Sequence, residues 1–132
     1  MNVSRTTYFS PDAFLLLSGA MGNERSYFVN SIATGECELW SINHGESYAI
    51  TRIDLEANKT TLVICCYGGD SYTKNLLAFG NYVIDLCKAR KWSIRIHTNK
   101  AKISDFMQKH FDFDQPEYVL TRGFKDGRKI EQ

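Results

Sequence analysis

The sequence is poor in proline, in net charge and in long apolar segments. It has two prolines among 132 residues, and sixteen Lys and Arg nearly balance fifteen Asp and Glu, which leaves a formal charge of +1. Binding of nucleic acid through bulk electrostatics is therefore not expected. The longest strongly apolar stretches, 13–17 and 62–67, are far too short to span a membrane. Residues 1–10 lack the apolar run of a signal peptide, so we expect a cytoplasmic protein.

The sequence does contain enough apolar surface for one core. Hydrophobic residues make up 43% of the chain and aromatic residues 13%, a composition typical of a folded globular domain. A chain of this length holds a single hydrophobic core, and no repeat, linker or charge block divides it. We expect one domain over residues 1–132, with a solvated tail from 123 to 132.

The four cysteines do not have the spacing of a metal site or of a disulfide framework. Cys65 and Cys66 are adjacent in a predicted strand, where successive side chains point to opposite faces. They are therefore not expected to converge on one ion, and we predict no metal site. With Cys37 and Cys87 they are interpreted as reduced, buried thiols. A redox role for one of them is the alternative.

Hydrophobic periodicity and turn residues predict ten elements. Alternating or β-rich runs, separated by turn residues such as His44-Gly45, predict strands, and a 3.6-residue period with capping residues predicts helices. The expected strands are 3–9, 37–42, 47–55, 60–67, 92–97 and 118–122, and the expected helices are 11–18, 24–32, 71–90 and 99–110.

The order β-α-α-β-β-β-α-β-α-β indicates an α/β (α+β) fold with a mixed, mostly antiparallel sheet. Three strands between residues 37 and 67 form an antiparallel meander. The continuous apolar run 62–66 is typical of a strand covered on both faces, so this strand is expected at the centre. The helix 71–90 then leads through a right-handed crossover to a parallel strand.

This order, together with the local sequence of residues 61–122, resembles the GNAT superfamily of N-acetyltransferases. The likeness is carried by the apolar strand, a turn, the helix containing Leu76-Leu77, the strand that ends shortly before Asn99, and Phe106-Met107 in the last helix. The resemblance implies a GNAT-like fold that binds acetyl-coenzyme A and transfers its acetyl group to an amine of a small molecule or peptide. The sequence is also similar to small phage-encoded proteins that have this fold and a degenerate cofactor motif.

The cofactor motif departs from the usual pattern of that family. Aligned on the leucine pair, Gly68 stands where Arg or Gln is usual, and Ser71 and Thr73 stand where two glycines are usual. Backbone amides at the start of the long helix would hold the pyrophosphate, whereas the carboxylate of Asp70 would repel it. A turn and helix cap without a ligand is the alternative. The cofactor-binding residues implied by the resemblance are Cys65, Cys66, Gly68, Gly69, Ser71, Tyr72, Thr73 and Asn99.

Three residues are candidates for the base that acetyl transfer to an amine requires. Asp54 and Glu56 lie at the hairpin before the central strand, and His97 ends the parallel strand. Each also has a purely structural interpretation, as a solvated turn carboxylate or as a half-exposed strand residue. The Tyr that serves as acid in the family is replaced by Met107 or Gln108, neither of which can protonate a thiolate, although water could.

Two functions remain open from the sequence. The first is an acetyl-CoA-dependent N-acetyltransferase. The alternative is a catalytically inactive module of the same fold, such as a phage accessory or structural protein, which binds a protein partner. The missing glycines and the missing Tyr favour the second, and the order of elements favours the first. A homodimer formed through sheet edges is compatible with both.

Overall fold

The computed structural model describes residues 2–69 and 72–97. Its first eight strands and helices follow the predicted order, and a short 3₁₀ turn lies between the first two helices. The elements are β1 (Val3–Thr6), α1 (Pro11–Met21), η1 (Gly22–Glu24), α2 (Arg25–Thr34), β2 (Cys37–Ile42), β3 (Ser47–Glu56), β4 (Lys59–Gly69), α3 (Tyr72–Arg90) and β5 (Ser93–Ile96). The predicted helix 99–110, strand 118–122 and tail lie outside the described residues.

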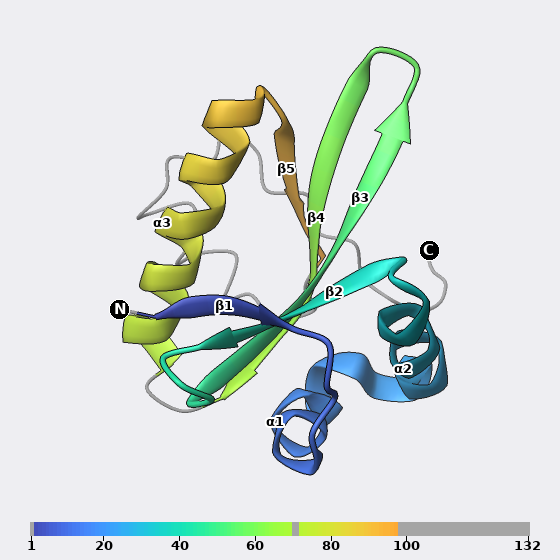
Figure 1. The fold of residues 1–132 in the computed structure, drawn as a ribbon, viewed down its shortest axis with the longest axis vertical. Coiled ribbons are helices and arrows are strands. Elements are labelled where there is room, and N and C mark those ends of the chain that lie inside the picture. The colour runs from blue at the N-terminus through green and yellow to red at the C-terminus, as the bar shows by residue number, and fades with distance from the viewer. Residues whose placement is uncertain (1, 70–71, 98–132) are drawn as a thin grey trace, which may run out of the picture.

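The five strands form one sheet in the order β1-β2-β3-β4-β5. Neighbours are antiparallel except β4 and β5, which are parallel and joined through α3 (Figure 1). The predicted mixed, mostly antiparallel sheet is therefore confirmed. β4 has a strand on either side over its first half, as the continuous apolar run predicted.

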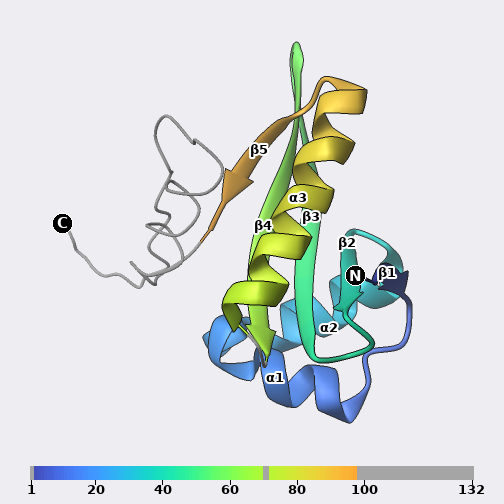
Figure 2. The same cartoon turned by 90° about the vertical axis from the view of Figure 1, so that its left-hand side faces the viewer.

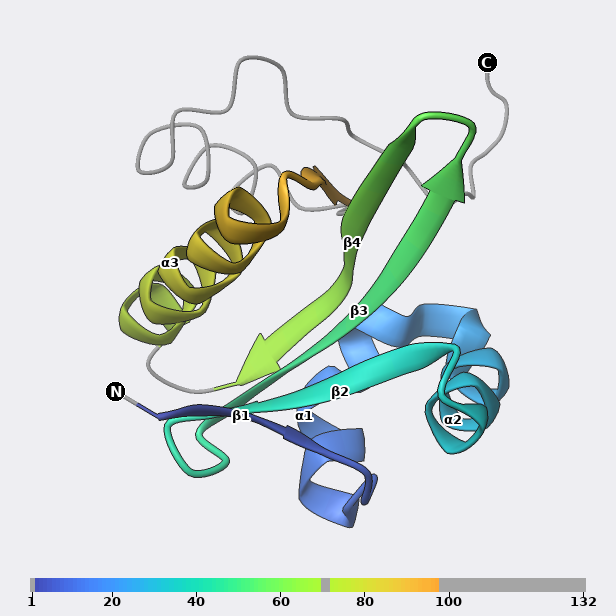
Figure 3. The same cartoon turned by 45° about the horizontal axis from the view of Figure 1, so that its top comes forward.

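Helices cover both faces of the sheet, with α3 on one face and α1 and α2 on the other (Figures 1 and 3). Each face has its own core. Phe79 and Val83 of α3 pack against Trp40 and Tyr67 of the sheet, whereas helices α1 and α2 pack against a second cluster that includes Leu39. Among the described residues, no helix is long and apolar enough to cross a membrane.

The ends of the N-terminal elements follow local chemistry with small corrections. The Oγ of Ser10 accepts a hydrogen bond from the amide of Ala13 at 3.1 Å, and Pro11 occupies the first turn, so α1 begins as predicted. It ends at Met21, later than expected, because the chain first turns at Gly22 (φ +55°). β1 is shorter than the predicted 3–9, since its pairing with β2 stops at Thr6.

The long helix α3 buries the stripe that its periodicity predicts. Leu76, Phe79 and Val83 are buried, whereas Leu77 is 36% exposed. The stripe also contains a polar residue, Asn75, which is fully buried. The amphipathic pattern therefore fixed the packing face of α3, but it did not account for this amide.

A β-bulge interrupts the central pair of strands at Cys65. Ile50 of β3 lies opposite Cys66, and Thr51 lies opposite Ile64, so Cys65 has no counterpart in β3. An extra residue of this kind breaks the alternation of side chains. Cys65 and Cys66 both pack against the α1/α2 cluster, and the prediction that they point to opposite faces was wrong.

Candidate functional site

The candidate site begins where β5 leaves β4. The two strands pair from Thr61 and Ser93 to Ile64 and Ile96, and the amide of His97 donates to the carbonyl of Ile64 at 2.9 Å. β4 then continues for residues 65–69 while β5 ends, and Figure 2 shows the two strands separating toward their C-terminal ends. The bulge at Cys65 coincides with the point of separation. The carboxyl ends of neighbouring parallel strands are where ligands of α/β sheets gather.

The two glycines at the end of β4 are required by the packing of the chain itself. A Cβ on Gly68 would lie 2.2 Å from the carbonyl oxygen of Leu16 in α1. Gly69 has a φ of +138°, and a Cβ there would lie 2.4 Å from the carbonyl oxygen of Glu46. Their presence is therefore explained without a ligand, and their predicted contact with a cofactor stays a prediction.

The thiols near the opening are held in their neutral form. Burial raises the pKa of Cys65 to about 12, and burial also raises the pKa of Cys66. The Cys65 thiol is half-buried and donates a weak hydrogen bond to the carbonyl of Val63. Because the thiolate is the nucleophilic form, these two residues are not suited to covalent catalysis. All four cysteines are free thiols.

Asp54 and His97 lie near enough for their charges to interact, although Asp54 is in register with Thr61 and Ser93, four residues before His97. The Nε of Arg52 donates to Oδ1 of Asp54 at 2.7 Å, and this hydrogen bond lowers the pKa of the carboxyl. The positive charges of Arg95 and His97 lower it further. Arg52 and Arg95 both lie opposite Val63, one on each side of β4. The result is a row of charged side chains from β3 and β5, on the two sides of Val63 in β4, and it includes the Asp54 carboxylate with its lowered pKa.

Glu56 lies away from this row. It pairs with Lys59 at the tip of the β3–β4 hairpin and is exposed. Five residues separate it along β3 from Thr51, which lies at the bulge, a distance of roughly 17 Å at 3.3–3.4 Å per residue. Of the three predicted bases, Asp54 and His97 lie near enough for their charges to interact, whereas Glu56 lies at the hairpin tip.

The remaining predicted residues lie at the start of α3 or outside the described residues. Tyr72 and Thr73 belong to the first turn of α3, and Thr73 is exposed. Ser71 and Asn99, like Asp70, lie outside the described residues. Within 2–69 and 72–97, no three His, Cys, Asp or Glu side chains come together in a way that could hold a metal ion.

Two charged residues near the site were missed from the sequence. Arg52 could have been found, because residues two apart in a strand share a face and it stands two before Asp54. Glu24, between α1 and α2, lies near enough for its negative charge to contribute to the raised pKa values of Cys65 and Cys66. No local signal marks Glu24, because only the folding of α1 onto β4 brings it there.

Comparisons with known proteins identify the fold but no family. No protein-family model matches the chain, and no curated protein does. Its structure is similar to the crystal structure of a protein described as a probable acetyltransferase, with a TM-score of 0.64 and 9% identity over 100% of this chain and 99% of that one.

It is also similar to the protein TTHA1254 from Thermus thermophilus, with a TM-score of 0.59 and 13% identity over 97% of this chain and 100% of that one. A point mutant of the same protein gives a TM-score of 0.57 and 14% identity, over 100% and 99% of the two chains. Identities this low support a shared fold alone. The chain therefore has a GNAT-like fold, a mixed α/β sheet with helices on both faces.

Proposed function

We propose that this protein is an N-acetyltransferase that moves an acetyl group from acetyl-coenzyme A to an amine. The observation that carries the proposal is the separation of β5 from β4 at Ile64 and His97, with the bulge at Cys65 beside it. Beyond the point where its pairing with β5 stops, β4 can accept an extended ligand that binds its backbone groups. The similarity to the probable acetyltransferase supports the same activity.

The cofactor would lie along β4 beyond the bulge. Its pantetheine arm would follow the backbone of residues 65–69, and its pyrophosphate would approach the first turn of α3, at Tyr72 and Thr73. The first amides of a helix have no partner within the helix, and the helix dipole favours an anion there. Ser71 and Asn99 belong to the same proposed set through the resemblance.

His97 is the proposed base, and Asp54 assists it. The imidazole takes a proton from the ammonium of the acceptor, and the charge of the Asp54 carboxylate, which interacts with that of His97, stabilises the imidazolium that forms. The freed amine nitrogen then bonds to the thioester carbonyl carbon, the carbon–sulfur bond breaks, and the nitrogen gives its second proton to water to leave the neutral amide. The departing thiolate takes a proton from water, a step that is easy because a thiol has a pKa near 8.5.

Titration with acetyl-coenzyme A tests the binding step. At about one hundred times its dissociation constant, a ligand that binds only the folded state stabilises it by roughly 2.7 kcal/mol. We expect a saturable heat in calorimetry and a matching rise in melting temperature. If both signals are absent at millimolar ligand, the proposal is refuted and a module that binds a protein partner is favoured.

Three substitutions test the catalytic assignment. His97→Gln is expected to lower kcat by about 10²–10⁴-fold, the usual contribution of a general base. Asp54→Asn removes the carboxylate that stabilises the imidazolium, so the acidic limb of the pH–rate profile should move to lower pH. Glu56→Gln is the matched control and should leave the profile unchanged. A full rate in His97→Gln would exclude His97 as the base.

A further inference from the structure

Asn75 is a polar side chain inside the apolar stripe of α3. It is fully buried and stands next to Leu76 in the helix. Burying an amide is costly unless its hydrogen-bonding groups find partners. Its Nδ2 donates to Oγ of Ser47 at 3.0 Å and to Oε1 of Glu46 at 3.2 Å. The buried amide thus joins the first turn of α3 to the start of β3.

Glu46 and Ser47 also contact the end of β4. At Gly69, an added Cβ would lie 2.4 Å from the carbonyl oxygen of Glu46 and 2.4 Å from Cα of Ser47. Glu46 and Ser47 therefore contact the chain on both sides of the β4–α3 connection, before it at Gly69 and after it at Asn75. This arrangement fixes where β4 ends relative to where α3 begins.

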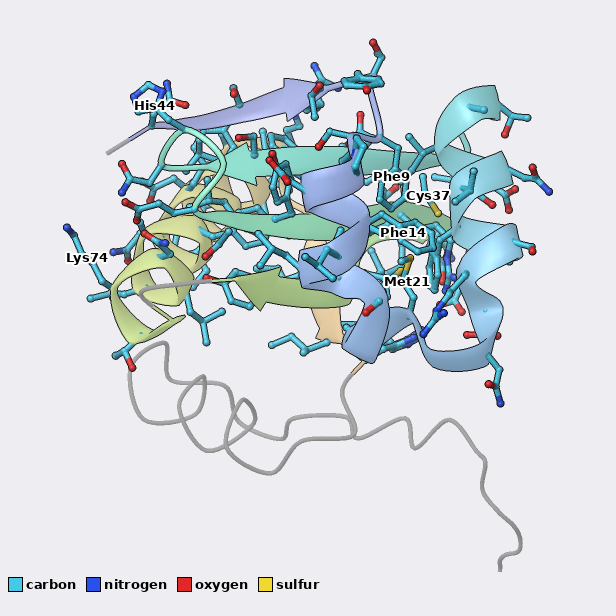
Figure 4. All side chains as sticks on the ribbon, turned by 90° about the horizontal axis from the view of Figure 1, so that it is seen from below. Phe9, Phe14, Met21, Cys37, His44 and Lys74 are labelled. Atoms are coloured by element: carbon cyan, nitrogen blue, oxygen red, sulfur yellow. The ribbon has the colours of Figure 1, made fainter. Side chains whose placement is uncertain are left out.

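Glu46 is itself held in place. The Nδ2 of Asn43 donates to its Oε1 at 2.7 Å, and this hydrogen bond, followed by the one from Asn75, lowers the pKa of the Glu46 carboxyl. The positive charges of Lys74 and His44 act in the same direction. Figure 4 shows these two residues at the same end of the molecule, one on α3 and one on the β2–β3 turn.

We infer that Asn75 and Glu46 are positioning residues, which hold the first turn of α3 in the orientation that receives the phosphates of the cofactor. This inference rests on the proposed function. A turn that must be ordered when the ligand binds lowers its affinity, by about tenfold for each residue whose backbone is newly fixed. The loss should affect the phosphate end of the ligand and spare the pantetheine arm along β4.

The test compares acetyl-coenzyme A with acetyl-pantetheine, which lacks the phosphates. For Asn75→Ala, we expect the Kd of acetyl-coenzyme A to rise about tenfold and that of acetyl-pantetheine to stay unchanged. Asn81→Ala, at an exposed position of the same helix, is the matched control and should change neither. A general loosening of the fold would weaken both ligands alike and would overturn the inference, as would unchanged affinity for both.

A second pair of variants serves if Asn75→Ala does not fold. Glu46→Ala and Glu46→Gln both remove a charge at an exposed position, but only Gln keeps an acceptor for Asn75. We expect the Ala variant to bind acetyl-coenzyme A about threefold more weakly than the Gln variant, and equal affinities would overturn the inference. If the unmodified protein binds neither ligand, the proposed function itself fails. That outcome is distinct from those that overturn only the inference about Asn75 and Glu46.

Discussion

Deleting Cys65 should leave the fold intact and remove the candidate site. A deletion within a strand normally turns every following side chain to the wrong face. Here the residue is an extra one. Ile64 packs on the α3 side, Cys66 on the α1/α2 side and Tyr67 on the α3 side. Without Cys65, these three residues alternate regularly, and each keeps the face that it has now.

The expected change in stability is small. The loss of a half-buried thiol lowers the free energy of unfolding by about 1 kcal/mol. A regular ladder in place of the bulge raises it by about 0.5–1.5 kcal/mol, the contribution of one hydrogen bond. With an unfolding entropy of about 2.1 cal/mol/K per residue, the melting temperature should move by less than about 4 °C. Deletion of the buried Leu39, which is regularly paired in β2, should cost at least about 2–5 kcal/mol.

Circular dichroism during heating measures the change in melting temperature, and calorimetric titration with acetyl-coenzyme A measures the loss of the candidate site. Cys65→Ala is the control, because it removes the thiol and keeps the residue count and the bulge. It should bind acetyl-coenzyme A like the unmodified protein, whereas the deletion should not bind it. If the deletion unfolds the protein as the Leu39 deletion does, the strand has no extra residue. If it folds and binds normally, the bulge has no part in the site.

Three further changes test the packing and the charges around the site. Gly68→Ala places a Cβ against the α1 backbone and should lower the free energy of unfolding by about 1–3 kcal/mol. At the control position Gly19 an added Cβ has nothing within 4 Å, so Gly19→Ala should raise it by about 0.5–1 kcal/mol. Chemical denaturation measures both changes. Thr51→Val leaves the buried indole N–H of Trp40 without its 2.8 Å acceptor and should cost about 1–3 kcal/mol, while Thr51→Ser should cost less because it keeps the hydroxyl. The carboxyl of Asp54 has a lowered pKa in the folded state, so the stability it adds is present above its unfolded pKa of about 3.9. That stability is lost as the pH falls through the folded pKa, and Asp54→Asn should flatten this acid limb of the stability curve; an unchanged limb would contradict the assignment.

The candidate site was only partly predictable from the sequence. The position of His97 directly after β5 (Ser93–Ile96) followed, to within one residue, from the alternation that predicted a strand over 92–97, and the separation of β5 from β4 could be anticipated only through the resemblance. Glu56 and Asp54 looked equivalent along the chain. The pairing of β3 with β4 separates them, because two residues of register decide whether a carboxylate lies level with β5 or at the hairpin tip.

The sequence by itself determined the identity and order of the elements described, because their signals are local. The Ser10-Pro11 start of α1, the apolar stripe of α3 and the alternation in β5 each depend on residues a few positions apart. Only the tertiary structure decided the bulge at Cys65, the need for glycine at position 68 and the role of Asn75. Each of these depends on which distant backbone lies opposite, and strand register and helix packing are set by the whole core rather than by neighbouring residues.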